Sequence, residues 1–203
     1  MSLTLYYSPQ SSASPVQWTL EELGVPYEKV CLDLKAGQQK QPEYLAVNPN
    51  GLVPALRHDG ATLFESAAIQ IYLGETFGVE KGLYPPAGPQ RAEALKWIIW
   101  CNVSVGEAIS RHFRNNLDFF PADQKNARAG EAAREDMAKL LAVLNQALSG
   151  RAYLLGDRFT LPDLHLSAWI DYVRETGIPL SAFANLDPWL QRCKDRPSFS
   201  KIE

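Results

Sequence analysis

Several residue patterns that define particular protein classes are missing from this sequence. Its 203 residues include only three cysteines, Cys31, Cys101 and Cys193, and no C-x-x-C motif. An odd number of widely spaced cysteines argues against a disulfide framework and a structural zinc site, and it is typical of a reducing compartment. We therefore expect a cytoplasmic protein that binds no metal.

Long apolar runs and a strong excess of one charge are missing as well. No apolar run approaches the ~20 residues that a helix needs to span a bilayer, and the first residues lack the basic start and apolar core of a signal peptide. The net charge of −3 provides no basic surface for nucleic acid. We expect neither a membrane nor a nucleic-acid partner.

The overall composition, 46% apolar and 21% charged, is ordinary for a folded chain of one or two domains. Residues 3–7 and 27–32 have the composition of strands. Between them, Pro15 suits the first turn of a helix, the serine before it suits the N-cap, and Gly24 follows the last apolar position. Residues 35–44 are polar and irregular, which predicts a loop or short helix before the next strands.

The most informative stretch begins with the turn signals Asn48-Pro49 and Asn50-Gly51. Val53-Pro54-Ala55-Leu56 follows and resembles a strand, but a proline lacks the N–H that a central strand needs. The segment either lies on a sheet edge or bends where strand pairing stops, and a cis Val53-Pro54 bond, which we hypothesise, would produce the bend. The main-chain N–H and C=O of Val53 could then pair with an extended peptide, as in strand addition.

The same stretch continues into a hairpin and a helix. Asp59-Gly60 predicts a tight hairpin turn, and Glu65-Ser66 opens a helix over residues 67–77. A hydroxyl and bare N–H groups at a helix start form an anion site, while the Glu65 carboxylate suits an amine. One short region therefore offers a peptide-pairing edge, a carboxylate site and an amine site.

A second domain is indicated after residues 78–89, which hold three glycines and three prolines. No strand pattern follows. Helices are expected over residues 90–116 and 123–148. A third helix is expected to begin at a capping box, in which Asp163 follows Thr160 by three residues. A last helix should run from Asp187-Pro188 to near residue 196.

Together, the pattern N-P-x-G-x-V-P-A-L over residues 48–56 and the Glu65-Ser66 pair resemble the cytosolic glutathione transferase family, in a bacterial form with a serine-type active-site turn. The resemblance implies an α/β thioredoxin-like domain (βαβ-ββα) in residues 1–78, a linker in 79–89 and an all-helical domain in 90–203. It also implies a homodimer that uses glutathione as cosubstrate against a soft, hydrophobic electrophile.

The resemblance places the residue that activates the glutathione sulfur in the turn after the first strand. A gapless match to the bacterial class with a cysteine there selects Ser12, whereas a match to the serine classes selects Ser11; Tyr6 ranks below both. A donor hydroxyl and a helix N-terminus favour the nucleophilic thiolate. The implied glutathione-binding residues are Gln39, Lys40, Val53, Pro54, Glu65 and Ser66.

The pocket for the second substrate would involve the first long helix, at Trp100, His112 and Phe113, although aromatic residues at helical spacing are also typical of a core. A serine cannot form the mixed disulfide that disulfide exchange requires, so conjugation is the expected activity. The alternatives are a glutathione-dependent peroxidase or disulfide reductase and a non-catalytic glutathione-binding module.

Overall fold

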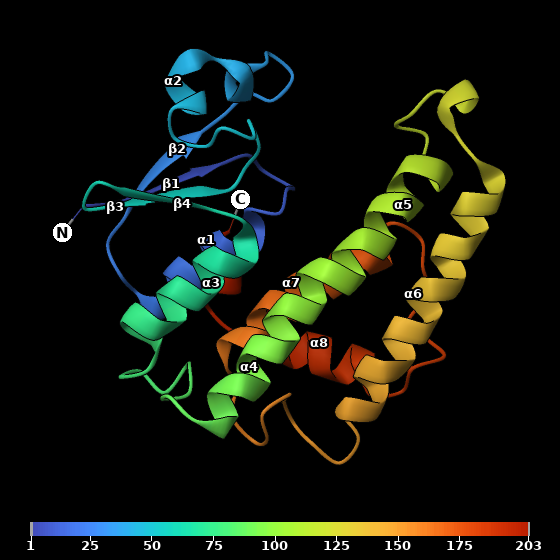
Figure 1. Ribbon diagram of the computed structural model, residues 1–203. Coiled ribbons are helices and arrows are strands. Elements are labelled where there is room, and N and C mark those ends of the chain that lie inside the picture. Colours follow the sequence, from blue (N-terminus) through green and yellow to red (C-terminus); the bar gives the residue numbers. More distant parts are fainter. Residues whose placement is uncertain (1, 203) are drawn as a thin grey trace. The chain divides into compact units, whose positions relative to one another are not determined.

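The computed structural model describes residues 2–202, which divide into two units. The N-terminal unit contains residues 2–92 together with 196–202, and the helical unit contains residues 93–195 (Figure 1). The final segment, which the sequence analysis assigned to the helical domain, thus packs with the N-terminal unit.

The N-terminal unit is built on a four-stranded mixed sheet with the order β2-β1-β3-β4. The strands are β1 (Leu3–Tyr7), β2 (Glu28–Cys31), β3 (Ala55–His58) and β4 (Ala61–Phe64). β1 runs parallel to β2 and antiparallel to β3, and β3 pairs antiparallel with β4. With α1 (Ser14–Leu23), α2 (Pro42–Leu45) and α3 (Ser66–Leu73), this order confirms the predicted βαβ-ββα arrangement.

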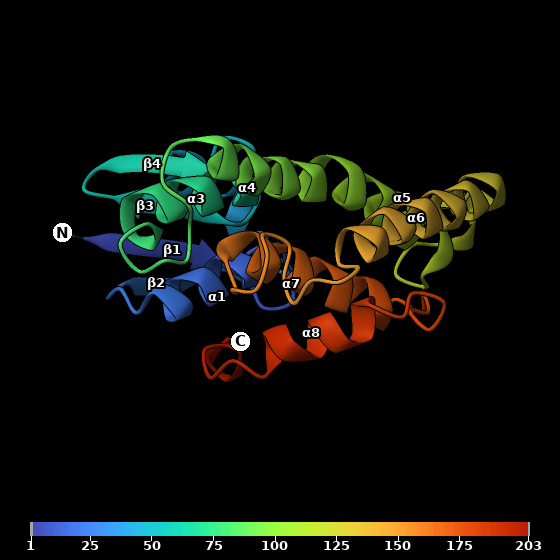
Figure 2. The same cartoon turned by 90° about the horizontal axis from the view of Figure 1, so that it is seen from below.

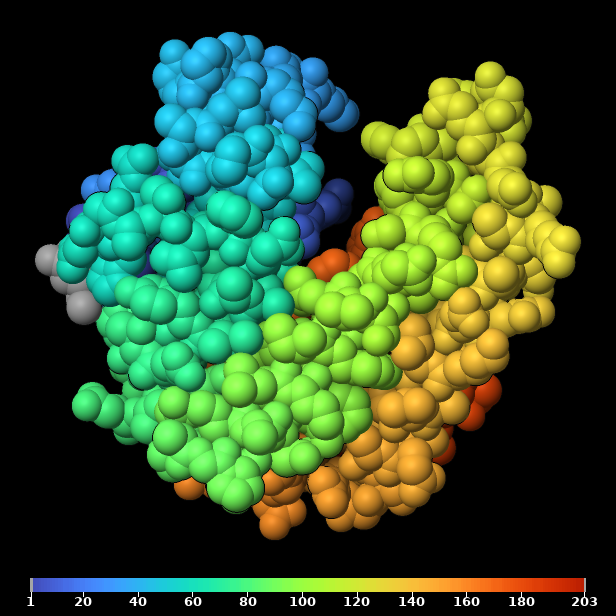
Figure 3. All heavy atoms as spheres, in the orientation of Figure 1, coloured from blue at the N-terminus to red at the C-terminus, as the bar shows by residue number. Residues whose placement is uncertain are grey.

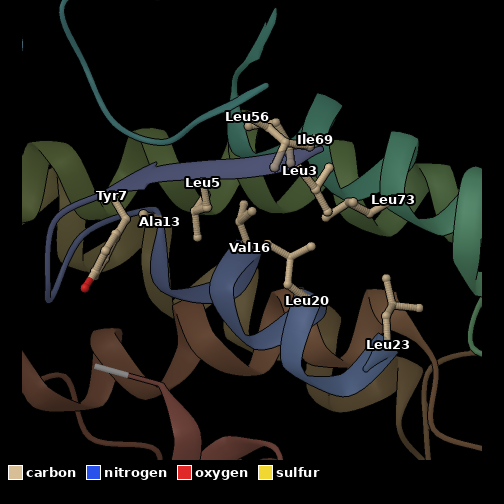
Figure 4. Packing of buried hydrophobic residues seen from close by; sticks show 10 residues of the cluster. All are labelled: Leu3, Leu5, Tyr7, Ala13, Val16, Leu20, Leu23, Leu56, Ile69 and Leu73. Carbon is tan, nitrogen blue, oxygen red and sulfur yellow. The ribbon is translucent and has the colours of Figure 1, made fainter. Parts of the chain in front are cut away.

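The sheet is covered on both faces because side chains alternate along β1. Leu3, Leu5 and Tyr7 join the core formed with α1 and α3, and Figure 4 shows Val16 and Leu20 of α1 pointing toward Leu5. The intervening side chains of β1 face the opposite side, where a smaller cluster around α2 covers the sheet.

The start of α1 differs from the sequence prediction. Ser14 is the first helical residue, so the N-cap is Ala13, which has no side chain that can cap the helix. The prediction of a serine N-cap was therefore wrong by one residue. The Ser11 hydroxyl supplies a related contact, because it accepts a hydrogen bond from the Ala13 N–H at 3.2 Å. Gly24 ends the helix in a left-handed conformation with φ +61°, as expected.

The centre of the sequence pattern folds as predicted. The Val53-Pro54 bond is cis, and β3 begins only at Ala55. Asp59 and Gly60 both have positive φ, as a type I′ hairpin turn requires. The predicted helix over residues 67–77 is present as α3, which continues directly into a π-helical turn over Gly74–Gly78.

The C-terminal segment is held to α1 by polar and aromatic contacts. Arg196 and the Ser198 hydroxyl both bind the Glu22 carboxylate. The Trp18 indole N–H donates to Ser198 Oγ at 2.9 Å, and its ring lies edge-on to Phe199 at 4.9 Å. These contacts join the end of the chain to the helix that follows the serine turn.

The helical unit is formed by α4 (Pro89–Trp100, whose first turn belongs to the N-terminal unit), α5 (Gly106–Asn116), α6 (Ala127–Ala147), α7 (Leu161–Glu175) and α8 (Leu186–Lys194). A π-helical turn over Cys101–Val105 joins α4 to α5, so the predicted helix over residues 90–116 is continuous but locally widened. α5 and α6 pack along each other (Figure 3). α8 lies beside α7 (Figure 2).

The predicted capping box at the start of α7 is present. The buried Asp163 carboxylate accepts hydrogen bonds from the Thr160 N–H and hydroxyl, the Leu154 N–H and the Trp189 indole. Burial raises the pKa of Asp163 to about 6, although these donors favour the charged form. This motif connects α7, α8 and the preceding loop, in keeping with its structural interpretation.

Candidate functional site

Three segments of the N-terminal unit meet at one end of the sheet. β1 ends at Tyr7 beside the start of β3, where Tyr6 pairs with Ala55, and β4 ends with Phe64 opposite Ala55. The segments that extend beyond this end are the serine turn over residues 8–13, the loop over residues 48–54 and the start of α3. The residues that the sequence pattern singled out are therefore neighbours in the fold.

The two candidate serines of the turn, Ser11 and Ser12, have different hydrogen-bond partners. Ser11 Oγ donates to the Ser8 carbonyl at 2.6 Å while accepting from the Ala13 N–H, so its hydroxyl holds the turn itself. Ser12 Oγ donates to the Val53 carbonyl at 3.1 Å, which joins the turn to the loop that carries the cis-proline. Of the two serines, only Ser12 thus contacts the predicted peptide-pairing edge.

The carbonyl just before Val53 is fixed by two buried side chains. The Tyr44 hydroxyl and the Asn48 amide donate to the Leu52 carbonyl at 2.6 Å and 2.7 Å. Asn48 Oδ1 in turn accepts from the main-chain and side-chain N–H groups of Asn50, both at 3.1 Å. Sequence reasoning recognised Asn48 only as a turn former and assigned no role to Tyr44.

Lys40 lies beside the same loop. Its Nζ donates to the Asn50 carbonyl at 3.4 Å, and its head group remains exposed. Gly51 has φ +60°, and a Cβ there would lie 2.8 Å from both Gln39 O and Lys40 Nζ. A glycine is therefore needed for Lys40 to approach the loop. The Gln39 amide points inward instead and donates to the Leu34 carbonyl at 3.2 Å.

Glu65 and Ser66 stand at the junction of β4 and α3. Glu65 has φ +70° and an exposed side chain, and it follows directly from the residue that pairs with Ala55. Non-glycine residues rarely adopt positive φ, and such strained positions cluster at functional sites. Ser66 is 3% exposed and is the first residue of α3, and the main-chain N–H groups and dipole of a helix start favour an anion.

Tyr6, the lower-ranked candidate for activating the sulfur, lies on the other face of the sheet from α1. Its ring is 5.7 Å from the Tyr44 ring and 5.9 Å from the Arg57 guanidinium. Tyr6 therefore contributes to the packing on the α2 side of the sheet. Ser12, in contrast, lies in the turn that enters α1, on the other side.

The predicted second-substrate residues lie in the helical unit and have different surroundings. Trp100 is half-buried and packs edge-on against Trp97 at 5.3 Å. Phe113 forms a cluster with Phe119 and Phe120, and Phe119 is 73% exposed. These rings leave aromatic surface available on the helical unit.

His112 is instead an interior residue that is 2% exposed. Its Nδ1 meets the Asn116 amide nitrogen at 3.0 Å, and its Nε2 meets the Thr176 carbonyl at 3.3 Å. An amide N–H donates to Nδ1, so Nε2 carries the proton and donates to the carbonyl. Both nitrogens are used within the helical unit, which argues against the expected contact with a second substrate.

Within residues 2–202, no group of three or more His, Cys, Asp or Glu side chains could hold a metal ion. Over the same residues, none of the helices combines the length and apolar character needed to cross a membrane.

Comparison with known families identifies the class of protein. Residues 1–75 match the family model described as "Glutathione S-transferase, N-terminal domain", and residues 108–197 match "Glutathione S-transferase, C-terminal domain". The chain belongs to the glutathione S-transferase family, and its N-terminal unit has the thioredoxin-like fold of that family.

Individual relatives agree with this assignment. The chain is 32% identical over 194 residues to "Glutathione S-transferase GstB" of Escherichia coli K12, covering 95% of this chain and 92% of GstB. It is 28% identical over 203 residues to "Disulfide-bond oxidoreductase YfcG" of the same organism, covering 97% and 92%.

Solved structures of similar proteins contain glutathione. A glutathione transferase from Burkholderia graminis with two glutathione molecules bound per subunit has a TM-score of 0.89 and 29% identity, covering 98% of this chain and 86% of that one. Ure2p in complex with glutathione has a TM-score of 0.90 and 25% identity, covering 98% and 92%.

Proposed function

We propose that the protein is a glutathione transferase that activates the glutathione thiol for attack on a soft electrophile. The observation that carries the proposal is the hydrogen bond from Ser12 Oγ to the Val53 carbonyl. It brings a hydroxyl from the turn before α1 to the edge where an extended peptide can pair. A cysteine-containing peptide bound there would have its sulfur near both the hydroxyl and the start of α1.

The remaining contacts suit the other parts of glutathione. Glu65 provides a carboxylate for the α-amino group of the γ-glutamyl end, while Ser66 and the start of α3 suit its carboxylate. Lys40 provides a cation for the glycine carboxylate. The amino group and the two carboxylates of glutathione would therefore each lie near a protein group that favours their charge, around Val53.

The structure favours Ser12 over Ser11 as the residue that donates to the sulfur. Ser11 already uses its proton inside the turn, at 2.6 Å from the Ser8 carbonyl. Ser12 instead donates to the Val53 carbonyl, which would accept a hydrogen bond from the cysteinyl N–H of bound glutathione. When that N–H pairs with Val53, the Ser12 hydroxyl can turn toward the sulfur and stabilise the thiolate.

The test compares Ser12→Ala with Ser11→Ala. The pKa of bound glutathione is measured from thiolate absorbance, and conjugation is followed with a panel of aromatic and unsaturated electrophiles. We expect Ser12→Ala to raise the thiol pKa by about one to two units, since a hydrogen bond to a charged group is worth roughly 1.5–3 kcal/mol. Ser11→Ala should chiefly lower stability. An unchanged thiol pKa in Ser12→Ala would refute the assignment.

A second candidate, glutathione-dependent reduction of disulfides, is supported by the likeness to YfcG and to a structure with two bound glutathione molecules. Ala13 and the serines before it provide no protein thiol in the turn, so two glutathione molecules would supply both sulfurs. Calorimetry distinguishes the candidates, because reduction predicts two glutathione molecules per chain and turnover of a small mixed disulfide, whereas conjugation needs only one.

Two further family properties belong to this proposal, namely a homodimer and a cytoplasmic location. The homodimer is inferred from the family alone, and the cytoplasmic location from the family together with the few, widely spaced cysteines, which suit a reducing environment. Sedimentation of the purified protein at micromolar concentration tests the dimer, and a sedimenting monomer would exclude it under those conditions.

A further inference from the structure

The Leu52 carbonyl receives two side-chain donors in a loop that otherwise has little regular structure. Tyr44 Oη and Asn48 Nδ2 lie 2.6 Å and 2.7 Å from this single oxygen. Both side chains are buried, at 4% and 2% exposure, whereas the Leu52 side chain is 60% exposed. The loop is thus anchored through its main chain, and its own side chain contributes little to that anchoring.

The next carbonyl along the chain is held from a different element. Val53 O accepts from Ser12, while Leu52 O accepts from α2 and the turn after it. Val53 lies at the bend before the cis-proline, and its Cα links the two peptide groups. Holding Leu52 O toward Tyr44 and Asn48 therefore limits the directions that Val53 O can take and keeps it toward the serine turn, where Ser12 contacts it.

Tyr44 is well suited to fix this geometry. Its ring belongs to the cluster that covers the second face of the sheet, and Val53 packs against the same cluster. Burial raises the pKa of the Tyr44 hydroxyl to about 12, so it stays protonated and can donate throughout the neutral range. A rigid ring anchored in the core thus positions one donor hydrogen under the loop.

We propose that Tyr44 is a positioning residue for glutathione, whose hydroxyl orients the Leu52–Val53 peptide group so that Val53 can pair with the cysteinyl main chain of the ligand. This inference rests on the proposed function and adds to it a residue that does not itself contact the ligand. Asn48 supports the same carbonyl, so removing one donor weakens the orientation without abolishing it.

The test uses Tyr44→Phe, which keeps the ring and removes the hydroxyl. We expect the Kd and KM for glutathione to rise about five- to tenfold, which corresponds to ~1–1.4 kcal/mol and lies within the range of a single hydrogen bond. The value of kcat at saturating glutathione should change less than twofold, because Ser12 and the start of α1 are not altered.

Tyr27→Phe is the matched control, because the Tyr27 hydroxyl also makes a 2.7 Å hydrogen bond, to Glu21 in the same unit. Tyr27→Phe should lose as much stability as Tyr44→Phe, without a change in the KM for glutathione. If the two variants raise KM equally, the Tyr44 hydroxyl has only a structural role and the proposal fails.

A modified ligand separates positioning from general loss of stability. Glutathione that carries a methyl group on the cysteinyl nitrogen cannot donate to Val53 O and keeps only the pairing with the Val53 N–H, so Tyr44→Phe should weaken its binding by a smaller factor than it weakens the binding of glutathione. An equal penalty for both ligands would overturn the proposal while leaving the proposed function intact. Failure of the unmodified protein to bind glutathione would instead refute the proposed function and, with it, this inference.

Discussion

The attachment of the C-terminal segment to α1 provides a prediction that can be worked out from the contacts. Glu22 is 8% exposed and binds Arg196 and the Ser198 hydroxyl. Burial alone would raise the pKa of Glu22, but the hydrogen bonds from Arg196 and Ser198 outweigh it and hold the pKa below its usual value. The charged carboxylate is therefore favoured in the folded protein.

Replacing Glu22 by Gln removes the charge and keeps the shape of the side chain. Breaking a fully buried ion pair costs about 3–5 kcal/mol, but Arg196 is 32% exposed and can be rehydrated. We therefore expect a loss of about 2 kcal/mol from the N-terminal unit at pH 7. Glu28→Gln on exposed β2 is the control, and it should change stability by less than about 0.5 kcal/mol.

The pH dependence gives the prediction its direction. A carboxylate whose pKa is lowered by folding stabilises the protein above its unfolded pKa of about 4.3, and this contribution is lost as pH falls through the folded value. The difference between the unmodified protein and Glu22→Gln should therefore shrink from pH 7 toward pH 3.

Two units need not unfold together, so hydrogen exchange of the α1 amides is the local measurement, with urea unfolding beside it. Equal exchange in both proteins at pH 7, or a difference that persists undiminished at pH 3, would refute the reasoning.

Two other variants test the site and the helical unit. Ser66→Ala should weaken glutathione binding by about tenfold with the fold retained, because a hydrogen bond to a charged carboxylate is lost. Calorimetry measures this affinity, with Ser110→Ala as the control, since the Ser110 hydroxyl binds a carbonyl of its own helix. Unchanged affinity in Ser66→Ala would contradict the prediction. Burial lowers the pKa of His165 to about 3, so the folded state holds it neutral and stability should fall as pH drops below about 6.5. His165→Gln should flatten that slope in urea titrations between pH 7 and pH 4, and an unchanged slope would show that other groups cause it.

Most of the fold could be predicted because the signals were local. The hairpin depends on Asp59-Gly60, the break before β3 on Pro54, and the start of α7 on the box formed by Thr160 and Asp163. Each of these acts through its own backbone or through residues within three or four positions. The cis bond and the βαβ-ββα order followed from such signals without knowledge of distant contacts.

The features that the sequence did not reveal share a different cause. The packing of residues 196–202 on α1 depends on Glu22, which lies more than 170 positions away, and composition near the C-terminus gives no sign of it. His112 has the residue type and helix position that suggested a pocket, but its ring nitrogens are hydrogen-bonded to Asn116 and to the carbonyl of Thr176, which lies sixty-four residues away. The sequence indicated Tyr44 only as part of a polar segment, because its hydroxyl donates to the Leu52 carbonyl, eight residues further along the chain.

The choice between Ser11 and Ser12 shows the same limit at the site itself. Sequence places two equivalent hydroxyls between a strand and a helix, and either register of the turn is acceptable locally. The difference is made by Val53, forty-one residues beyond Ser12, whose carbonyl meets one hydroxyl while the turn uses the other. The orientation of that carbonyl depends in turn on the donors from Tyr44 and Asn48 to its neighbour. A mutation at either donor should therefore weaken the pairing of glutathione with Val53, even though neither residue belongs to the turn. It follows that exchanging the serine turn between relatives should transfer thiol activation only when the loop over residues 44–54 is exchanged with it.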